Sequence, residues 1–188
     1  MSFTSISRNI SMLAIAGMLS AGFVVAGTVT VKQLALEKEG IELIGQLEDV
    51  ARDIQFSAGQ LQAVNVRGHN AKWTRHHHLM QIKDLVNGGL QPAPARLTEI
   101  QPELKEWQRA AIDKMLASAN TLASDANSAI LNQNENGNLP PLLNPEFKEL
   151  IANVTHHAEA LVKTADAAGD YAVALERAEE ARRRVPKH

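Results

Sequence analysis

Apolar residues recur at intervals of three and four along most of the chain after residue 31, and this spacing constrains the fold more than any other feature. The spacing is heptad-like and places apolar side chains on one face of an α-helix, whereas a strand requires alternation at every second residue. The first stripe of this kind consists of Leu47, Val50, Ile54, Leu61, Val64, Ala71, Ile82 and Leu85. We therefore predict an all-α protein in which the helices bury their stripes against one another, as in a coiled coil.

The first stripe is interrupted by the sequence NVRGHN at residues 65–70. Gly68 followed by Asn70 is typical of a helix C-cap and a new N-cap, and would divide the segment into two helices. The register of apolar residues resumes in phase after the interruption, however, which favours one long helix kinked at Gly68. The same register places Ser57, Arg75 and His78 on the buried side.

Two further helices follow. The sequence NGGLQPAPAR predicts a loop at residues 88–97, because Gly favours helix ends and Pro interrupts helices. The next helix is expected to begin at Thr98 or Gln101 and to continue to about Leu131. Residues 132–144, rich in Asn and Pro, predict a second loop.

The last helix begins with a strong start signal. In the sequence NPE, Asn144 is a good cap, Pro suits the first helical position, and Glu is favourable at the positive end of the helix dipole. We expect a bend or brief break around Gly169. We thus predict an antiparallel bundle over residues 32–184, with three long helices, or four if Gly68 lies in a turn. Residues 185–188 form a C-terminal tail.

The bundle is preceded by an uncharged run from Asn9 to Val31. This run is long enough to span a membrane. It also contains the apolar core of a secretory signal peptide, with a passable cleavage site after Ala26. We predict that residues 1–31 form a signal peptide or a signal-anchor helix. The anchor is favoured because the helical pattern continues out of the run without a break.

Either alternative places the bundle in the cell envelope. An anchored chain would be a single-pass inner-membrane protein with a periplasmic body, and a chain cleaved after Ala26 would be secreted or periplasmic. The membrane is therefore a predicted partner through residues 9–31.

The composition excludes several functions. The chain contains no Cys, so it has no disulfide, thiolate nucleophile, Fe–S cluster or covalently attached haem. Its formal net charge of −2 and its 4% aromatic content do not suit a nucleic-acid-binding protein. It has neither a nucleophile elbow nor a Gly-rich phosphate loop. We predict that it is not an enzyme, and we assign no catalytic, cofactor-binding or metal-binding residue.

Histidines are grouped at residues 76–78 and 156–157. Consecutive side chains on a helix point about 100° apart, so such a group rarely supplies several ligands to one metal. We interpret the histidines as a largely solvated face, with His78 and His157 at partly buried edges. His156 and Glu159 share one face and form a possible weak cation site.

Trp73, His77 and Met80 lie on the side of their helix away from the main stripe. In one continuous helix they would form an exposed apolar patch that contacts a protein partner or a second copy of the chain. If the helix breaks at Gly68 they would join the core. The core is favoured because buried Trp is commoner than Trp at a binding surface.

Part of the last helix resembles the second helix of a tetratricopeptide repeat. The matching residues are Gly169, Asp170, Tyr171, Ala174, Leu175, Ala181 and Pro186. A single half-repeat implies no peptide-binding groove, because stacked repeats are needed to form one.

The wider layout is an export segment followed by long helices, with WQRAAIDKMLASANTLASDANSAI in the middle. It is similar to uncharacterised bacterial exported or membrane-anchored helical-bundle proteins. That resemblance implies an envelope location and no particular activity. The expected function is that of a scaffold or interaction module; the alternative is a bundle-type carrier of a haem, a metal or a small ligand.

Overall fold

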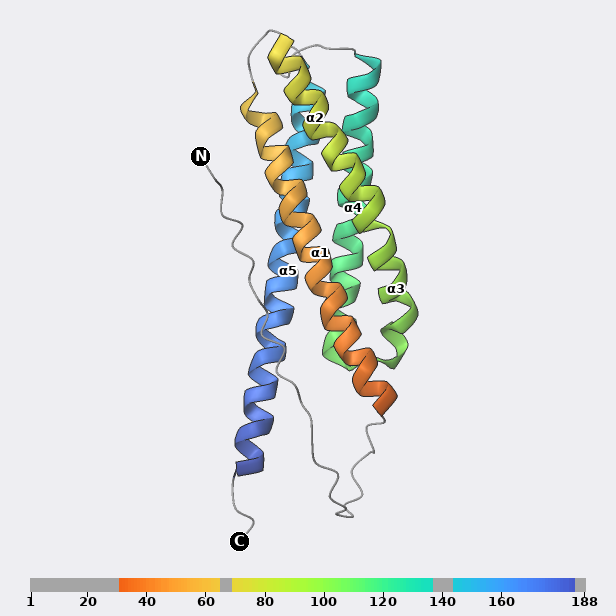
Figure 1. The fold of residues 1–188 in the computed structure, drawn as a ribbon, viewed down its shortest axis with the longest axis vertical. Helices are drawn as coiled ribbons and strands as arrows, with labels where there is room; N and C mark the ends of the chain where they lie inside the picture. Colours follow the sequence, from red (N-terminus) through yellow and green to blue (C-terminus); the bar gives the residue numbers. More distant parts are fainter. Residues whose placement is uncertain (1–30, 65–68, 137–143, 185–188) are drawn as a thin grey trace.

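The computed structural model describes residues 31–64, 69–136 and 144–184, and these residues are almost entirely helical (Figure 1). The elements in chain order are α1 (Val31–Ala63), α2 (His69–Leu85), the π-helix η1 (Val86–Leu90), α3 (Pro92–Ile100), the 3-10 helix η2 (Gln101–Glu103), α4 (Glu106–Glu135) and α5 (Pro145–Arg184). In Figure 1, α1 rises, α2 to α3 descend together, α4 rises and α5 descends. The described part of the chain is an antiparallel four-helix bundle without strands, which confirms the all-α prediction.

The prediction of one long helix through Gly68 is wrong. α1 ends at Ala63, and α2 begins at His69 and packs against α1 in the opposite direction, as Figure 1 shows. Gly68 itself lies outside the described residues. A continuous helix over residues 34–86 would be about 80 Å long, whereas α4, with 30 residues, is about 45 Å long. Folding back allows α2 to bury its stripe in the shared core, so the continuity of register across the turn is coincidental.

The predicted loop at residues 88–97 is also wrong, because η1 and α3 make most of it helical. Pro92 occupies the first turn of α3, where the backbone N–H that proline lacks would have no acceptor within the helix. Gly89 lies against α1: a Cβ atom there would be 2.5 Å from Cγ2 of Val50. The glycine thus permits a close approach of two helices and does not end one.

α4 begins later than predicted, at Glu106 and not at Thr98 or Gln101. The extended backbone of Leu104 separates it from η2. Gln108, which is buried, secures this start: its Oε1 accepts a hydrogen bond from the Lys105 N–H (3.2 Å), and its Nε2 donates one to the Glu37 carbonyl (3.2 Å). α4 continues to Glu135, four residues past the expected end.

The start signal of α5 is confirmed. Asn144 Oδ1 accepts a hydrogen bond from the Phe147 N–H (3.0 Å), and Asn144 Nδ2 donates to Asn132 Oδ1 on α4 (2.7 Å). α5 is unbroken at Gly169, contrary to the brief break that was expected as one possibility. Its continuity also means that the part of the chain resembling a tetratricopeptide helix is not preceded by the turn of such a repeat.

The core follows the predicted first stripe in part: Leu47, Ile54, Leu61 and Ile82 are buried, whereas Val50, Val64, Ala71 and Leu85 are half-buried. Its fully buried large side chains include Leu47, Ile54, Leu61, Ile82, Ile112, Met115, Leu122, Phe147, Ile151 and Leu161. Buried alanines, among them Ala58, Ala126 and Ala158, allow the helices to approach closely. α5 packs most extensively against α1 and α4, whereas α2 packs chiefly against α1.

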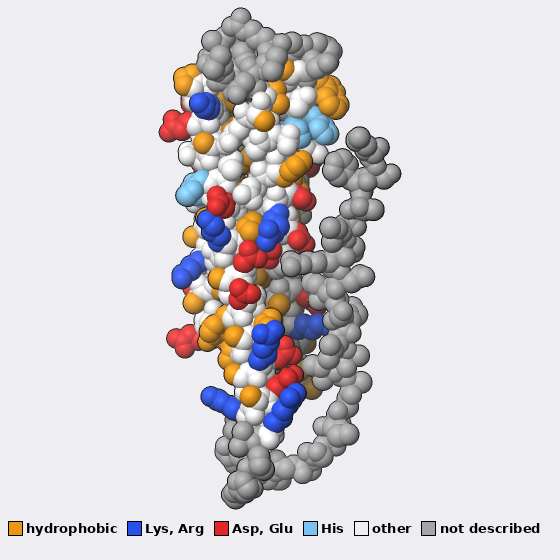
Figure 2. Space-filling model, turned by 90° about the vertical axis from the view of Figure 1, so that its left-hand side faces the viewer, with side chains coloured by type: hydrophobic (Ala, Val, Ile, Leu, Met, Phe, Trp, Pro, Cys, Tyr) orange, Lys and Arg blue, Asp and Glu red, His pale blue; other side chains and the backbone are white. Residues whose placement is uncertain are grey.

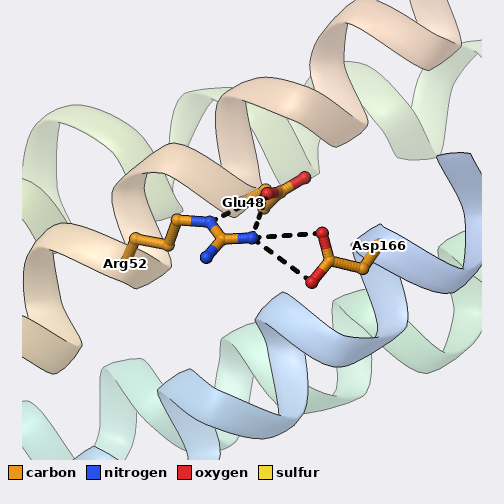
Figure 3. A network of polar contacts seen from close by, with 3 residues as sticks. All are labelled: Glu48, Arg52 and Asp166. Carbon is orange, nitrogen blue, oxygen red and sulfur yellow. Dashed lines mark hydrogen bonds and ion pairs between the residues drawn. The ribbon is translucent and has the colours of Figure 1, made fainter. Parts of the chain in front are cut away.

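Ion pairs on the surface link the helices. Figure 3 shows Arg52 on α1 between Glu48 and Asp166 of α5: Nη2 is 2.6 Å from Glu48 Oε1 and 3.1 Å from Asp166 Oδ1. Arg96 of α3 is bound in the same way by Glu39 of α1 (2.6 Å), and this hydrogen bond lowers the pKa of Glu39. Such exposed pairs contribute little to stability, because water and salt screen them, so the apolar core supplies most of the stability.

Among the residues described, no helix combines the length and apolar character needed to cross a membrane. The predicted signal or anchor segment, residues 1–31, lies outside the described residues except for Val31. The predicted tail at 185–188 lies outside them too.

Candidate functional site: an exposed aromatic face on α2

One face of α2 packs into the core, and another face is exposed to solvent. Arg75, Leu79 and Ile82 are buried, whereas Trp73 and His77 are exposed. Residues two positions apart on a helix lie about 200° apart, so a core face through Arg75 and Leu79 turns Trp73 and His77 outward. The prediction that these residues join the core when the helix breaks at Gly68 is therefore wrong: Trp73 remains 64% exposed.

The exposed rings contact one another along the helix. Trp73 and His77 stack with their ring centroids 5.2 Å apart and their planes within 3° of parallel. His77 in turn meets the edge of His78 (5.3 Å, 62°), and His78 Nδ1 lies 2.8 Å from Gln81 Oε1. We call Trp73, His77 and the half-buried Met80 the α2 face. Figure 2 shows histidine and hydrophobic side chains together near the upper right edge of the bundle.

The residues predicted to lie on the buried side of the first stripe are buried or half-buried in both α1 and α2. Ser57 and Arg75 are buried, and His78 is half-buried as expected. Burial lowers the pKa of the Arg75 guanidinium by removing water from the charged group. The guanidinium retains its proton, because an arginine pKa starts far above neutral pH. α2 therefore places a cation on its inner side and aromatic rings on its outer side.

The second group of histidines, on α5, has different partners. His157 is half-buried, as predicted, and its Nδ1 lies 2.7 Å from Asp125 Oδ2 on α4. His156 is exposed and meets the edge of the His157 ring. Glu159 pairs with Lys163 at 2.7 Å, and this contact is the main cause of the lowered pKa of Glu159. At the possible weak cation site of His156 and Glu159, the Glu159 carboxylate is therefore paired with Lys163.

Metal-ligating side chains do not converge in the described ranges: no group of three or more His, Asp or Glu there is arranged to hold a metal ion. The histidines of α2 and α5 form separate clusters, each with its own partners. No contact between the two clusters connects them into one site within those ranges.

The large exposed hydrophobic side chains are concentrated toward the two ends of the bundle. Phe56 and Leu131 lie near the end where α2 begins, as Trp73 does, and sequence analysis did not single them out. The other end carries Val31, Leu34, Ile41, Tyr171 and Val173. Phe56 and Leu131 both lie off the apolar stripes of their helices, and that displacement is the signal by which the sequence could have identified them.

Comparison with protein families, with curated proteins and with solved structures gave no match to this chain. The class of the protein is therefore defined by its fold alone, as a four-helix bundle with an exposed aromatic face. The α2 face and the uncharged sequence of residues 9–31 are the two features that bear on its function.

Proposed function

We propose that this chain is a non-enzymatic interaction module of the cell envelope that binds another protein through the α2 face. The observation that carries the proposal is the exposure of Trp73, which is 64% exposed and whose ring stacks on that of His77. Exposed apolar side chains grouped on a surface mark interaction sites more often than isolated ones do. Tryptophan is also among the residues that contribute most to protein–protein binding.

The stacking of the rings favours binding. A side chain that is free in solution loses rotamer entropy when a partner orders it. Trp73 is already restrained by the parallel ring of His77, and His77 touches His78, which contacts Gln81. A partner therefore meets an ordered aromatic surface, and less of the binding free energy is lost in ordering it.

The envelope location rests on the uncharged run at residues 9–31. We propose that this run is retained as a single-pass anchor, with removal after Ala26 as the alternative. Carbonate-washed membranes should then retain the full-length chain of 20.4 kDa. A soluble product that begins at Gly27 would refute retention and would still support export.

The binding proposal is tested with Trp73→Ala in the full-length chain. A photo-crosslinking residue placed at the exposed His76, beside the α2 face, should capture a protein in native membranes. Trp73→Ala should reduce that capture at least about tenfold, the effect of losing one interface anchor. The stability should change by less than about 1 kcal/mol, because an exposed side chain is removed. Chemical denaturation measures this second quantity.

Tyr171→Ala is the matched control. Tyr171 is also an exposed aromatic residue, but its ring lies 5.2 Å from that of Trp107, in the first turn of α4 at the opposite end of the bundle. Its replacement should leave capture unchanged. Equal capture by the parent chain and the Trp73→Ala variant would contradict a binding role for the α2 face, and capture of a second copy of this chain would identify the partner as the protein itself.

A further inference from the structure

The start of α1 and the end of α5 lie at the same end of the bundle (Figure 1). The two helices are joined at mid-length by Arg52 and Asp166 and diverge below that level. The first turns of α1 then pack toward α3 and α4, where Glu39 pairs with Arg96 and Glu37 pairs with Lys105 (2.9 Å). α5 continues downward away from them.

The last part of α5 extends beyond the packed bundle. Every side chain from Glu176 to Arg184 is exposed, and we call these nine residues the α5 extension. It is about 13 Å long at 1.5 Å per residue. Its acidic residues precede its tip, which carries Arg182, Arg183 and Arg184. A surface that approaches the tip of the α5 extension therefore meets a cluster of positive charge first.

The arrangement of the three arginines indicates the shape of the surface that they meet. Consecutive residues on a helix point about 100° apart, so the three guanidinium groups spread over more than half of the circumference. A pocket would require them on one side, whereas a broad surface that crosses the helix axis can contact all three. Arg183 and Arg184 each have a glutamate one turn earlier, at 4.0 and 3.7 Å, yet both side chains remain 81% exposed.

Apolar side chains accompany the arginines at this end. Val31 and Leu34, in the first turn of α1, are 87% and 62% exposed. Val31 is the last residue of the uncharged run at residues 9–31, which we have proposed as a membrane anchor, and Leu34 lies three residues after it. Exposed aliphatic groups and arginines at the same end of the bundle suit a lipid interface, which offers acyl chains and phosphates at adjacent depths.

We propose that this end of the bundle docks on an anionic phospholipid surface, with Arg182, Arg183 and Arg184 of the α5 extension contacting the lipid phosphates. This inference rests on the proposed anchoring by residues 9–31. A second copy of the chain fits the extension less well. Parallel pairing brings like charges close together, and antiparallel pairing directs the two bundles, with their anchors, in opposite directions.

The test uses the full-length chain mixed with two kinds of vesicle, one of pure phosphatidylcholine and one containing phosphatidylglycerol at about one third of the lipid. Flotation measures membrane attachment, and amide hydrogen exchange measures protection of the α5 extension. We expect attachment to both vesicles, and exchange in the extension at least about threefold slower on the anionic vesicles, because the anionic surface attracts each arginine. The protection should weaken at high salt.

The variant Arg182→Gln/Arg183→Gln/Arg184→Gln should lose the protection and retain attachment. Lys72→Gln/Lys148→Gln removes exposed charges in the first turns of α2 and α5, near the opposite end, and should retain both the protection and the attachment. Equal exchange on the two vesicles, or protection that survives the triple substitution, would overturn the docking proposal while leaving the anchor intact. If the chain floats only with anionic vesicles and the triple substitution abolishes flotation, the docking proposal is supported and the anchor is refuted. If the chain floats with neither kind of vesicle, the docking proposal and the anchor are both overturned. None of these outcomes depends on the α2 face.

Discussion

Gly88 and Gly89 are adjacent in η1 but have different surroundings. An added Cβ at Gly89 would lie 2.5 and 2.8 Å from the two γ-carbons of Val50, whereas one at Gly88 would meet nothing within 4 Å. Val50 is β-branched and has little freedom to move aside. We expect Gly89→Ala to destabilise the fold by about 1–3 kcal/mol through overpacking, and Gly88→Ala to stabilise it by up to about 1 kcal/mol. Urea unfolding of both variants, followed by circular dichroism, measures the difference. Equal stabilities would contradict the close contact between η1 and α1.

At the scale of the element, α4 contains a buried leucine and an exposed one that differ in little else. Leu122 is fully buried in the core, and Leu131 is 59% exposed. Leu122→Asp should destabilise the bundle by at least about 3 kcal/mol, because it removes apolar packing and buries a carboxylate without a partner. Val154→Asp, at a fully buried position of α5, should have an effect of similar size. Leu131→Asp should cost less than about 1 kcal/mol. Thermal unfolding of the three variants tests this ranking, and a Leu131→Asp effect as large as that of Leu122→Asp would refute the orientation of α4.

At the scale of the whole molecule, the core is complete without the uncharged run. α1, α2, α4 and α5 all contribute buried apolar side chains to one cluster, and α3 closes the side next to α1 with Leu97 and Ile100. We expect a fragment beginning at Lys32 to be soluble, strongly helical and cooperative on heating, because each stripe has a partner within the fragment. Circular dichroism and calorimetry test this expectation. An aggregated fragment, or one that unfolds gradually, would show that the bundle needs residues before Lys32 or another protein.

The sequence alone determined the helical class, the buried stripes and the start of α5, because each of these depends on residues close together in the chain. The spacing of three and four located Leu47, Ile54 and Leu61 in the core, and Asn144 marked a helix start through a hydrogen bond to the first turn of α5. The uncharged run likewise predicts an envelope location from local composition, and that remains a prediction.

Only the tertiary structure decided that α2 packs back against α1 and that residues 88–97 are largely helical. The stripe on either side of Gly68 has the same phase in a straight helix and in a hairpin, and only the size of the shared core favours the hairpin. Gly89 resembles a helix-ending residue in the sequence, whereas its role is set by Val50, 39 positions earlier in the chain. The exposure of Trp73 was decided in the same way, because folding α2 onto α1 turned Arg75 and Leu79 inward and left the opposite face to the solvent.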